Sequence, residues 1–399
     1  MKNGVMVQKD SKKLKVLMVT TSFPVGPNRA SGIFVKRLAD SMSAQIDLTV
    51  LTPSAVDLLE ARFDYQVKCF RYAPYKWQIL AHQPGGIVVA LKSHPWLVLL
   101  LPVFLLALFF SVIIHGKKVD VIHANWSSTG FIAGIAAKII GKPVITTLRG
   151  SDVRSIEESA LSRFIMEQTF RFSRLIVTVS ETIAQDLSRL WSDQREKLCA
   201  IANGVSDDLL SIQHRSKNDS LIVSTIGSLI PRKDIATIIR AFQMIEGDVQ
   251  LRIIGEGIER TALESVSQQL EVSNRVVFVG ALPPEAISEE LAITDIFVLS
   301  SYFEGRPNVV LEAMAAGCAI VTTDLPGVRE LLEKDINGLF FQPGDAEALA
   351  KHLKSLLSSE KRRRQLGREA RSRIIEMGLT WSNCGARYIS LYQRVLEQN

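Results

Sequence analysis

The sequence has few of the residues and motifs that mark secreted, metal-binding or nucleic-acid-binding proteins. It contains four cysteines, which are far apart and form no CxxC pair, so we expect neither a disulfide framework nor a zinc site. The first residues include lysines but lack the layout of a cleavable signal peptide. There is no recognised nucleic-acid motif and no interleaving of basic and aromatic residues. These absences favour a protein of a reducing compartment without a nucleic-acid partner.

The charge of the chain is unevenly distributed. Residues 1–205 carry 25 Lys and Arg against 15 Asp and Glu, whereas residues 206–399 carry 22 against 26, and the whole chain has a net charge of +6. A basic N-terminal half predicts an anionic partner for that half. Because nothing indicates nucleic acid, we favour an anionic membrane surface, and therefore peripheral membrane contact.

Short β-branched runs alternate with helical stretches in two series. The first series of expected strands is 15–22, 46–52, 119–125, 143–150 and 174–180, and the second is 220–229, 249–257, 275–280, 295–301 and 319–324. Nearly continuous apolar strands separated by helices indicate parallel sheets that are covered on both faces. We therefore predict an α/β protein with two Rossmann-like doubly wound domains facing across a cleft. The predicted boundaries are 1–205 for the first domain, 206–219 for a polar linker, 220–380 for the second domain and 381–399 for a last helix.

One apolar segment interrupts this pattern. Pro95–Ile114 is 20 residues long without a charge, which is enough to cross a membrane by length and hydropathy. The strands before and after it are expected in one sheet, and a single crossing would separate them. Three interpretations stay open: a buried core helix, a helix lying in the membrane surface and a true span.

Three loops of the first domain are candidate ligand loops, because open α/β sheets bind ligands beyond the C-terminal ends of their strands. Gly32 lies between a strand and a helix, so its backbone can approach a phosphate or sugar, although a plain turn would look the same. Arg149 and Asp152 follow a strand and could hold substrate groups, or Ser151 or Asp152 could cap the next helix. Asn203-Gly204 reads better as a structural turn.

The second domain has a candidate diphosphate site in "TIGSLIPRKDIATIIRAF". A strand leads to a turn at Gly227, and Arg232 and Lys233 follow where a helix is expected to begin. The alternative is that both cations are only solvated. Cations at a helix N-terminus interact unfavourably with the positive end of the helix dipole. A bound phosphate would offset this unfavourable energy.

The stretch "YFEGRPNVVLEAMAAGC" combines a polar start with an apolar run. Glu304 lies in the loop, Pro307 suits a first helical turn, and Asn308 and Glu312 share a helix face. Helix N–H groups could meet phosphates while the two glutamates accept hydrogen bonds from hydroxyls. A ligand with central phosphates and hydroxyl-rich groups at both ends is a nucleotide sugar.

These segments together resemble the retaining glycosyltransferases of family 4, which have the GT-B fold. The E-x7-E pattern from Glu304 to Glu312 resembles their donor-binding signature. Other segments fall in the family's order along nearly the whole chain, among them "VDVIHANWSSTGFIAGIAAKIIGKPVITTLRGSDV", "RLIVTVSETIAQDL", "AIANGVSDDLL", "LRIIGEGIER" and "INGLFFQPGD".

The resemblance implies a role for each matching residue. Arg232 and Lys233 would bind the donor diphosphate and stabilise the leaving group, with Gly227 in the same turn. Glu304 would contact the transferred sugar and Glu312 the ribose. The remaining donor residues would be Gly32 across the cleft and Pro307, Asn308 and Val309 at the start of the helix, while Arg149 and Asp152 would lie on the acceptor side.

Two positions depart from the family pattern. Arg149 stands where many members have a histidine, so the role of that histidine does not transfer, and Ser228 stands where an arginine often follows the glycine. His123 is interpreted as a strand-end residue and not as a catalyst. In this fold the last helix commonly returns to the N-terminal domain, which 381–399 would do.

The implied function is retaining transfer of a hexose-type sugar from a UDP- or GDP-sugar to a lipid-linked or growing cell-surface glycan. No metal and no cofactor is expected, because protein cations would serve the diphosphate and no Asp-x-Asp lies in a suitable loop. The expected location is cytoplasmic, at the inner face of the cytoplasmic membrane. The alternatives are another GT-B nucleotide-sugar enzyme, such as a small-acceptor transferase or an epimerase, and a non-catalytic donor-binding partner.

Overall fold

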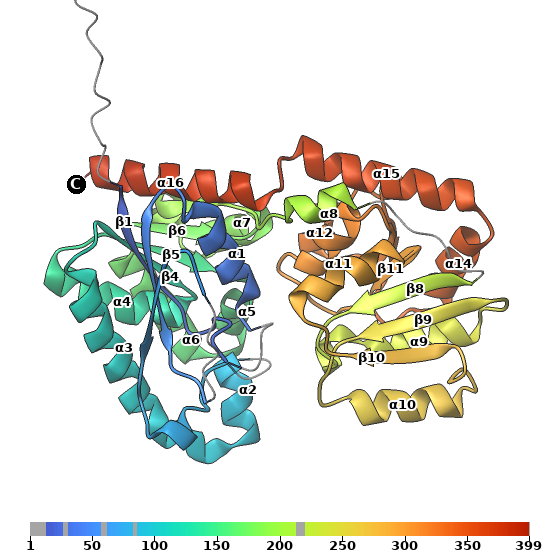
Figure 1. Cartoon of the computed structure of the whole chain (residues 1–399), viewed down its shortest axis with the longest axis horizontal. Coiled ribbons are helices and arrows are strands. Elements are labelled where there is room, and N and C mark those ends of the chain that lie inside the picture. The colour runs from blue at the N-terminus through green and yellow to red at the C-terminus, as the bar shows by residue number, and fades with distance from the viewer. Residues whose placement is uncertain (1–12, 27–30, 57–61, 83–85, 213–219, 399) are drawn as a thin grey trace, which may run out of the picture.

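The computed structural model describes residues 13–26, 31–56, 62–82, 86–212 and 220–398. The chain forms two α/β domains side by side, each built on one parallel sheet with helices on both faces (Figure 1). This confirms the predicted fold class.

The N-terminal sheet has seven parallel strands in the order β3-β2-β1-β4-β5-β6-β7. They are β1 (Lys15–Val19), β2 (Asp47–Pro53), β3 (Gln66–Phe70), β4 (Val121–Asn125), β5 (Val144–Leu148), β6 (Leu175–Thr178) and β7 (Leu198–Ala200). The sequence pattern missed β3 and β7, because both are short edge strands whose residues are mostly exposed or half-buried. A strand covered on one side only lacks the continuous apolar run of a central strand.

The C-terminal sheet has six parallel strands in the order β10-β9-β8-β11-β12-β13. They are β8 (Leu221–Ile226), β9 (Val249–Ile254), β10 (Val276–Gly280), β11 (Ile296–Leu299), β12 (Ala319–Thr323) and β13 (Leu339–Phe341). In each domain the strand order reverses beside the first strand, between β1 and β4 and between β8 and β11. Ligands of open α/β sheets bind at this switch point, beyond the carboxyl ends of the strands.

The helices that cover the sheets follow the strands in alternation. The N-terminal domain contains α1 (Ile33–Met42), η1 (Tyr75–Trp77), α2 (Gly86–Ser93), η2 (Pro95–Leu100), α3 (Leu101–Gly116), α4 (Ser127–Ile140), α5 (Ser151–Glu158), α6 (Ala160–Phe172), α7 (Glu181–Leu190) and η3 (Ser192–Lys197). The rest of the chain contains α8 (Asp207–Ser211), η4 (Pro231–Lys233), α9 (Ile235–Gln243), α10 (Arg260–Gln269), α11 (Pro284–Ala292), α12 (Asn308–Ala315), α13 (Pro326–Arg329), α14 (Ala346–Leu357), α15 (Glu360–Glu376) and α16 (Trp381–Glu397).

Alternation along the strands builds hydrophobic cores on both faces of each sheet, because successive side chains point to opposite faces of a sheet. In β1, Val16 and Met18 pack with α1 and α16, whereas Leu17 and Val19 pack with α3 and α4. In β11, Ile296 and Val298 pack with α9 and α14. Phe297 and Leu299 point to the other face and pack with α12. The strands therefore contribute apolar side chains to both faces.

The last helix lies on the N-terminal domain. Tyr388 and Tyr392 of α16 are buried in the core that α1 and the sheet form. The chain thus passes between the domains twice, and the two passages are joined by backbone hydrogen bonds, from the Val205 N–H to the Leu379 carbonyl (2.9 Å) and from the Trp381 N–H to the Val205 carbonyl (3.1 Å). Two adjacent passages are a suitable place for a hinge.

The predicted linker 206–219 differs from the structure in part. Residues Asp207–Ser211 form the short helix α8, and Leu209 is buried in a core of the C-terminal domain beside α12. Residues 213–219 lie outside the described residues. The polar composition of this segment hid an apolar contact, because one buried leucine is enough to dock a single helical turn.

The apolar segment Pro95–Ile114 forms η2 and most of α3. Residues Leu97, Phe104, Leu108 and Val112 are at most 1% exposed and pack against the sheet. The helix is long and apolar enough to cross a membrane, and 22% of its most apolar window is buried in the structure. Since α3 lies on the sheet that contains both β3 and β4, a span is wrong for this fold, and the segment is a half-buried surface helix.

Candidate active site

The candidate site lies at the carboxyl ends of β8 and β11, which are neighbours at the switch point of the C-terminal sheet. The first strand leads to η4, which carries Arg232 and Lys233, and the second leads to the loop that carries Glu304. The two cations were expected at the start of a helix, but they lie in a 3-10 turn before α9, which begins at Ile235. Strand order thus brings together two segments that lie about seventy residues apart.

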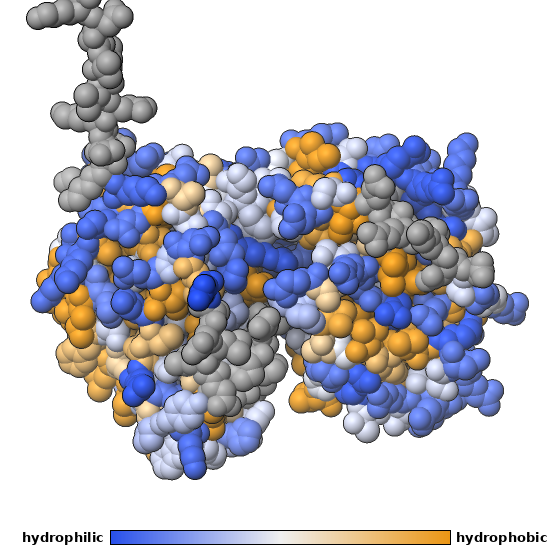
Figure 2. All heavy atoms as spheres, viewed as in Figure 1, coloured by the Kyte–Doolittle hydropathy of each residue, from blue (hydrophilic) through white to orange (hydrophobic). Residues whose placement is uncertain are grey.

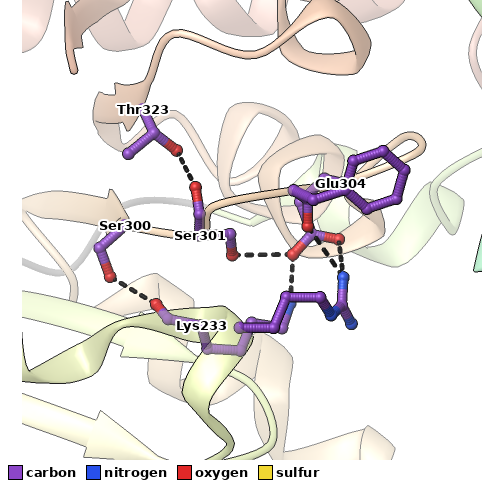
Figure 3. Close-up of polar contacts among 7 residues, drawn as sticks. Lys233, Ser300, Ser301, Glu304 and Thr323 are labelled. Carbon is purple, nitrogen blue, oxygen red and sulfur yellow. Dashed lines mark hydrogen bonds and ion pairs between the residues drawn. The ribbon is translucent and has the colours of Figure 1, made fainter. Parts of the chain in front are cut away.

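Glu304 is the centre of a cluster of hydrogen-bond donors (Figure 3). Its Oε1 accepts hydrogen bonds from Lys233 Nζ at 2.6 Å and Ser301 Oγ at 2.8 Å. Its Oε2 receives only a long bond from Arg232 Nη1 at 3.4 Å among the described residues. Burial alone would raise the pKa of Glu304, but the charges of Lys233 and Arg232 and the hydrogen bonds outweigh it and lower the pKa. Glu304 is therefore an ionised carboxylate with one oxygen still able to accept.

Backbone contacts hold the cluster in place. The Ser300 hydroxyl donates to the Lys233 carbonyl at 2.7 Å, and the Tyr302 N–H donates to the Arg232 carbonyl at 2.9 Å. The Thr323 hydroxyl of β12 donates to the Ser301 carbonyl at 2.8 Å (Figure 3). Gly227 lies beside the Lys233 side chain, since a Cβ there would be 3.5 Å from Lys233 Cε. The site is thus built on three adjacent strands.

The helix α12 begins next to Glu304. Pro307 is its N-cap, one position earlier than the expected first turn, and Asn308 opens the helix. Val309 is half-buried, and Gly317 follows the helix with a φ of 80°, which a glycine adopts without strain. The helix N-terminus lies at the same edge of the sheet as Lys233.

Glu312, which the resemblance assigns to the ribose, forms an ion pair with Arg37 of α1. Both side chains are mostly buried, with 12% and 20% of their surface exposed. Gly32 is the N-cap of the same helix α1, with a φ of 68°, and a Cβ there would lie 2.1 Å from the Ser22 carbonyl oxygen. The ion pair of Arg37 and Glu312 therefore links helix α1 with the donor-side helix α12 across the domains.

Arg149 joins the two domains through amide side chains. Its guanidinium donates to Asn125 Oδ1 at 2.5 Å and to Asn203 Oδ1 at 3.1 Å, and it lies over the Phe34 ring. Asn203 Nδ2 in turn donates to Asn308 Oδ1 at 2.9 Å. A chain of two hydrogen bonds, through Asn203, thus connects Arg149 after β5 with Asn308 at the start of α12.

Asp152 has a local role in the structure. Its carboxylate accepts hydrogen bonds from the N–H groups of Arg149 (3.1 Å), Gly150 (3.1 Å) and Ser127 (3.0 Å). Burial raises the pKa of Asp152, although these hydrogen bonds oppose the rise. The expected capping of α5 by Asp152 is wrong, because Gly150 is the N-cap of that helix and no side chain caps it. Asp152 instead holds the backbone before α5 and the first N–H of α4. Contact of Asp152 with an acceptor stays a prediction.

His123 is a core residue. Its ring nitrogens contact Tyr392 Oη at 2.7 Å and Thr147 Oγ1 at 2.8 Å, and it is fully buried. Burial, together with the charge of Arg149, lowers its pKa to about 3. Both nitrogens of this buried imidazole are occupied by core hydroxyl groups, so the ring is not presented to a substrate, in agreement with the interpretation from the sequence.

Sequence reasoning missed Arg37 and Glu330, which join the domains, and interpreted Asn203 only as part of a turn. Glu330 accepts hydrogen bonds from the N–H groups of Thr182 (2.6 Å) and Glu181 (3.2 Å) at the start of α7. Gly150 and Gly305 also meet, since a Cβ on either would lie 3.3 Å from the Cα of the other. Arg37 lies within α1 and Glu330 follows α13, so no strand-end pattern marks them. Their partners lie in the other domain, and only the fold identifies them.

Known proteins match both domains. The model of the family described as "Glycosyltransferase Family 4" matches residues 31–209, and that described as "Glycosyl transferases group 1" matches residues 207–373. The chain belongs to the family 4-like GT-B glycosyltransferases. The structure of HepE from Anabaena in complex with UDP shares the fold of this glycosyltransferase, with a TM-score of 0.76, 19% identity and coverage of 96% of this chain and 100% of HepE.

The names of two curated relatives describe steps of glycan synthesis. The N-acetylgalactosamine-N,N'-diacetylbacillosaminyl-diphospho-undecaprenol 4-alpha-N-acetylgalactosaminyltransferase of Campylobacter jejuni is 27% identical over 54% of this glycosyltransferase and 59% of the relative. The capsular polysaccharide biosynthesis glycosyltransferase CapM of Staphylococcus aureus is 23% identical over 66% and 74%.

Proposed function

We propose that this glycosyltransferase moves a hexose-type sugar from a UDP- or GDP-sugar to a lipid-linked or growing cell-surface glycan, with retention of anomeric configuration. The observation that carries the proposal is the cluster of Arg232, Lys233 and Glu304 beside the N-terminus of α12. It offers cations for a diphosphate and a carboxylate oxygen for a sugar hydroxyl within one site.

The donor diphosphate would lie between the two cations and the N–H groups that begin α12. Charge-assisted hydrogen bonds from Arg232 and Lys233 are strong, and the helix N-terminus adds partial positive charge. As the bond between the anomeric carbon and the diphosphate oxygen breaks, negative charge develops on the leaving group. These groups are aligned in advance for that charge, which is how electrostatic stabilisation lowers a barrier.

Retention would follow from attack on the face that the diphosphate leaves. The acceptor oxygen forms the new bond to the anomeric carbon, and its proton passes to the leaving diphosphate. Retaining glycosidases instead use a nucleophilic carboxylate about 5 Å from an acid/base carboxylate. Here Glu304 is held by Lys233 and Ser301 and Asp152 by three backbone N–H groups, so neither carboxylate is presented as a nucleophile.

The acceptor proposal draws on the names of the relatives and on the basic N-terminal half. The name of one relative describes transfer to a diphospho-undecaprenol-linked sugar, and the name of the other describes capsular polysaccharide synthesis. The HepE structures contain UDP and UDP-glucose, which supports a nucleotide-sugar donor. Such an acceptor would place this protein in the cytoplasm, at the inner face of the cytoplasmic membrane, without nucleic acid as a partner.

Purified protein tests the proposal in two steps. We expect a UDP- or GDP-sugar to raise the melting temperature, because a ligand that binds only the folded state stabilises it, and the same donor to be hydrolysed or transferred in the presence of EDTA. Donor binding without any turnover would indicate a non-catalytic partner, and sugar epimerisation would indicate a different GT-B enzyme. Activity that disappears with EDTA would contradict metal independence.

A further inference from the structure

The outward face of η2 and α3 is a continuous apolar surface. Its residues recur every three or four positions, which places them on one side of the helix. They are Leu99 (75% exposed), Val103 (50%), Leu106 (56%), Phe110 (56%) and Ile114 (64%). A helix that faces water normally carries polar side chains on its outer side. Exposed apolar patches of this kind mark interaction sites.

The two ends of this face have different chemistry. At the start of η2, Trp96 lies edge-on to Trp77 of η1 with ring centroids 6.1 Å apart, and both rings are about half exposed. At the end of α3, Lys117 and Lys118 are exposed. Burial lowers the pKa of His115 at this end of α3, and the charges of Lys68 and Lys118 lower it further. Lys68 therefore lies at the same end as Lys118.

The apolar face lies on the outside of the N-terminal domain. Figure 1 shows α3 on the side away from the C-terminal domain, and Figure 2 shows hydrophobic residues gathered along the same margin of the molecule. On α4, which packs against α3, Ile139 is 64% exposed beside the exposed Lys138. The apolar surface with adjacent cations therefore continues beyond one helix.

We propose that the outward face of α3 is a membrane-docking surface, which lies parallel to a bilayer that contains anionic lipids. Helices of this kind bury an apolar face at the boundary of headgroups and acyl chains. Tryptophan is favoured at that depth, and lysines near the surface are attracted by anionic headgroups. A second protein copy would explain the apolar stripe, but not the aromatic and cationic ends.

A docking surface would bring the enzyme to its acceptor, and this role rests on the proposed function. A lipid-linked acceptor stays in the membrane, so an enzyme that docks by α3 meets it without leaving the surface. The inward face of α3 is packed on the sheet, and docking thus needs no change of fold.

The test is flotation of the full-length protein with vesicles of phosphatidylcholine alone and of phosphatidylcholine mixed with phosphatidylglycerol. The test variant carries Leu99→Gln, Leu106→Gln and Phe110→Gln. The control variant carries Ile258→Gln and Ile375→Gln, which change apolar residues that are 82% and 62% exposed on the C-terminal domain.

We expect the native protein to float best with the anionic vesicles and less at high salt. The test variant should bind at least about tenfold more weakly, whereas the control should bind as the native protein does. Quenching of Trp96 fluorescence by brominated lipid would support the predicted depth. Because the three positions are exposed, the melting temperature of the test variant should be unchanged.

Three outcomes overturn the proposal: no flotation of the native protein with either vesicle at low salt, equal binding of the test variant, or a native dimer that this variant converts to a monomer without any vesicle binding. Thermal shifts with UDP and with GDP separate this proposal from the proposed function. Flotation without any nucleotide binding would leave the docking surface standing and remove the transferase proposal.

Discussion

Arg37 of α1 and Glu312 of α12 form an ion pair that joins the two domains beside the candidate donor site. The glutamate belongs to the helix whose N-terminus faces the site, and the arginine lies one turn into the helix that Gly32 begins. A carboxylate has four acceptor positions, so Glu312 can hold Arg37 and still accept from a ribose hydroxyl. The pair is therefore suited to couple the position of the donor to the approach of the domains.

The substitution Arg37→Gln should loosen this coupling. Glu312 would lose its cation from the other domain, and removing one partner of a mostly buried pair costs on the order of 3 kcal/mol. We expect a larger radius of gyration in small-angle scattering and about a tenfold fall in kcat/KM. Lys36→Gln is the matched control, because Lys36 pairs with Asp40 on its own helix at 2.6 Å. Scattering and kinetics that are unchanged in Arg37→Gln would contradict a coupling role.

The substitution Lys233→Ala should remove most of the transfer activity. It deletes a cation at 2.6 Å from Glu304 and leaves that carboxylate with Ser301 and the long contact to Arg232. We expect a fall in kcat of about 10²–10³, the usual cost of one group that stabilises a leaving charge. Lys351→Ala, at an exposed position of α14, should turn over normally. Near-native kcat for Lys233→Ala would remove this residue from the mechanism.

His123 should make the protein less stable in acid. Its pKa is lowered to about 3, so below pH 6.5 the unfolded chain binds a proton that the folded chain does not. Folding stability contributed by this group is therefore present above pH 6.5 and decreases as the pH falls toward 3, by up to about 1.4 kcal/mol per pH unit.

The variant His123→Gln should lose stability at neutral pH, because it removes buried contacts, but its free energy of unfolding should fall less steeply from pH 6.5 to pH 4. Urea denaturation at several pH values measures both effects. His94→Gln, at an exposed position, should keep the native slope. A slope in His123→Gln as steep as that of the native protein would show that His123 does not carry the acid sensitivity.

Gly255 should be more sensitive to substitution than other glycines of the C-terminal domain. It has a φ of 138°, and a Cβ there would lie 1.8 Å from the carbonyl oxygen of Gly227, beside Lys233. Gly255→Ala should therefore cost at least about 2 kcal/mol of stability through strain and steric overlap. Gly247→Ala is the control, since its φ is 99° with no atom within 4 Å, and it should cost about 1 kcal/mol. Equal melting temperatures of the two variants would contradict the steric argument.

The local sequence pattern was sufficient to predict the central strands and the loops that follow them. The apolar runs of β1, β4, β8 and β11 are buried on both sheet faces, and such runs are recognisable one at a time. The edge strands β3, β7 and β13 escaped notice, because they are short or exposed on one side. Residues Arg232, Lys233 and Glu304 were found since each follows a recognisable strand.

The sequence by itself determined the class of the fold, the family and the residues at the ends of the strands, because these depend on short patterns and their order. Only the tertiary structure decided which of these residues meet. It paired Arg37 with Glu312 and connected Arg149 to Asn308 through Asn203, since those contacts form between domains that are distant in the chain. It also decided that Pro95–Ile114 packs one face on a sheet and leaves the other exposed, which no hydropathy profile distinguishes from burial on all sides.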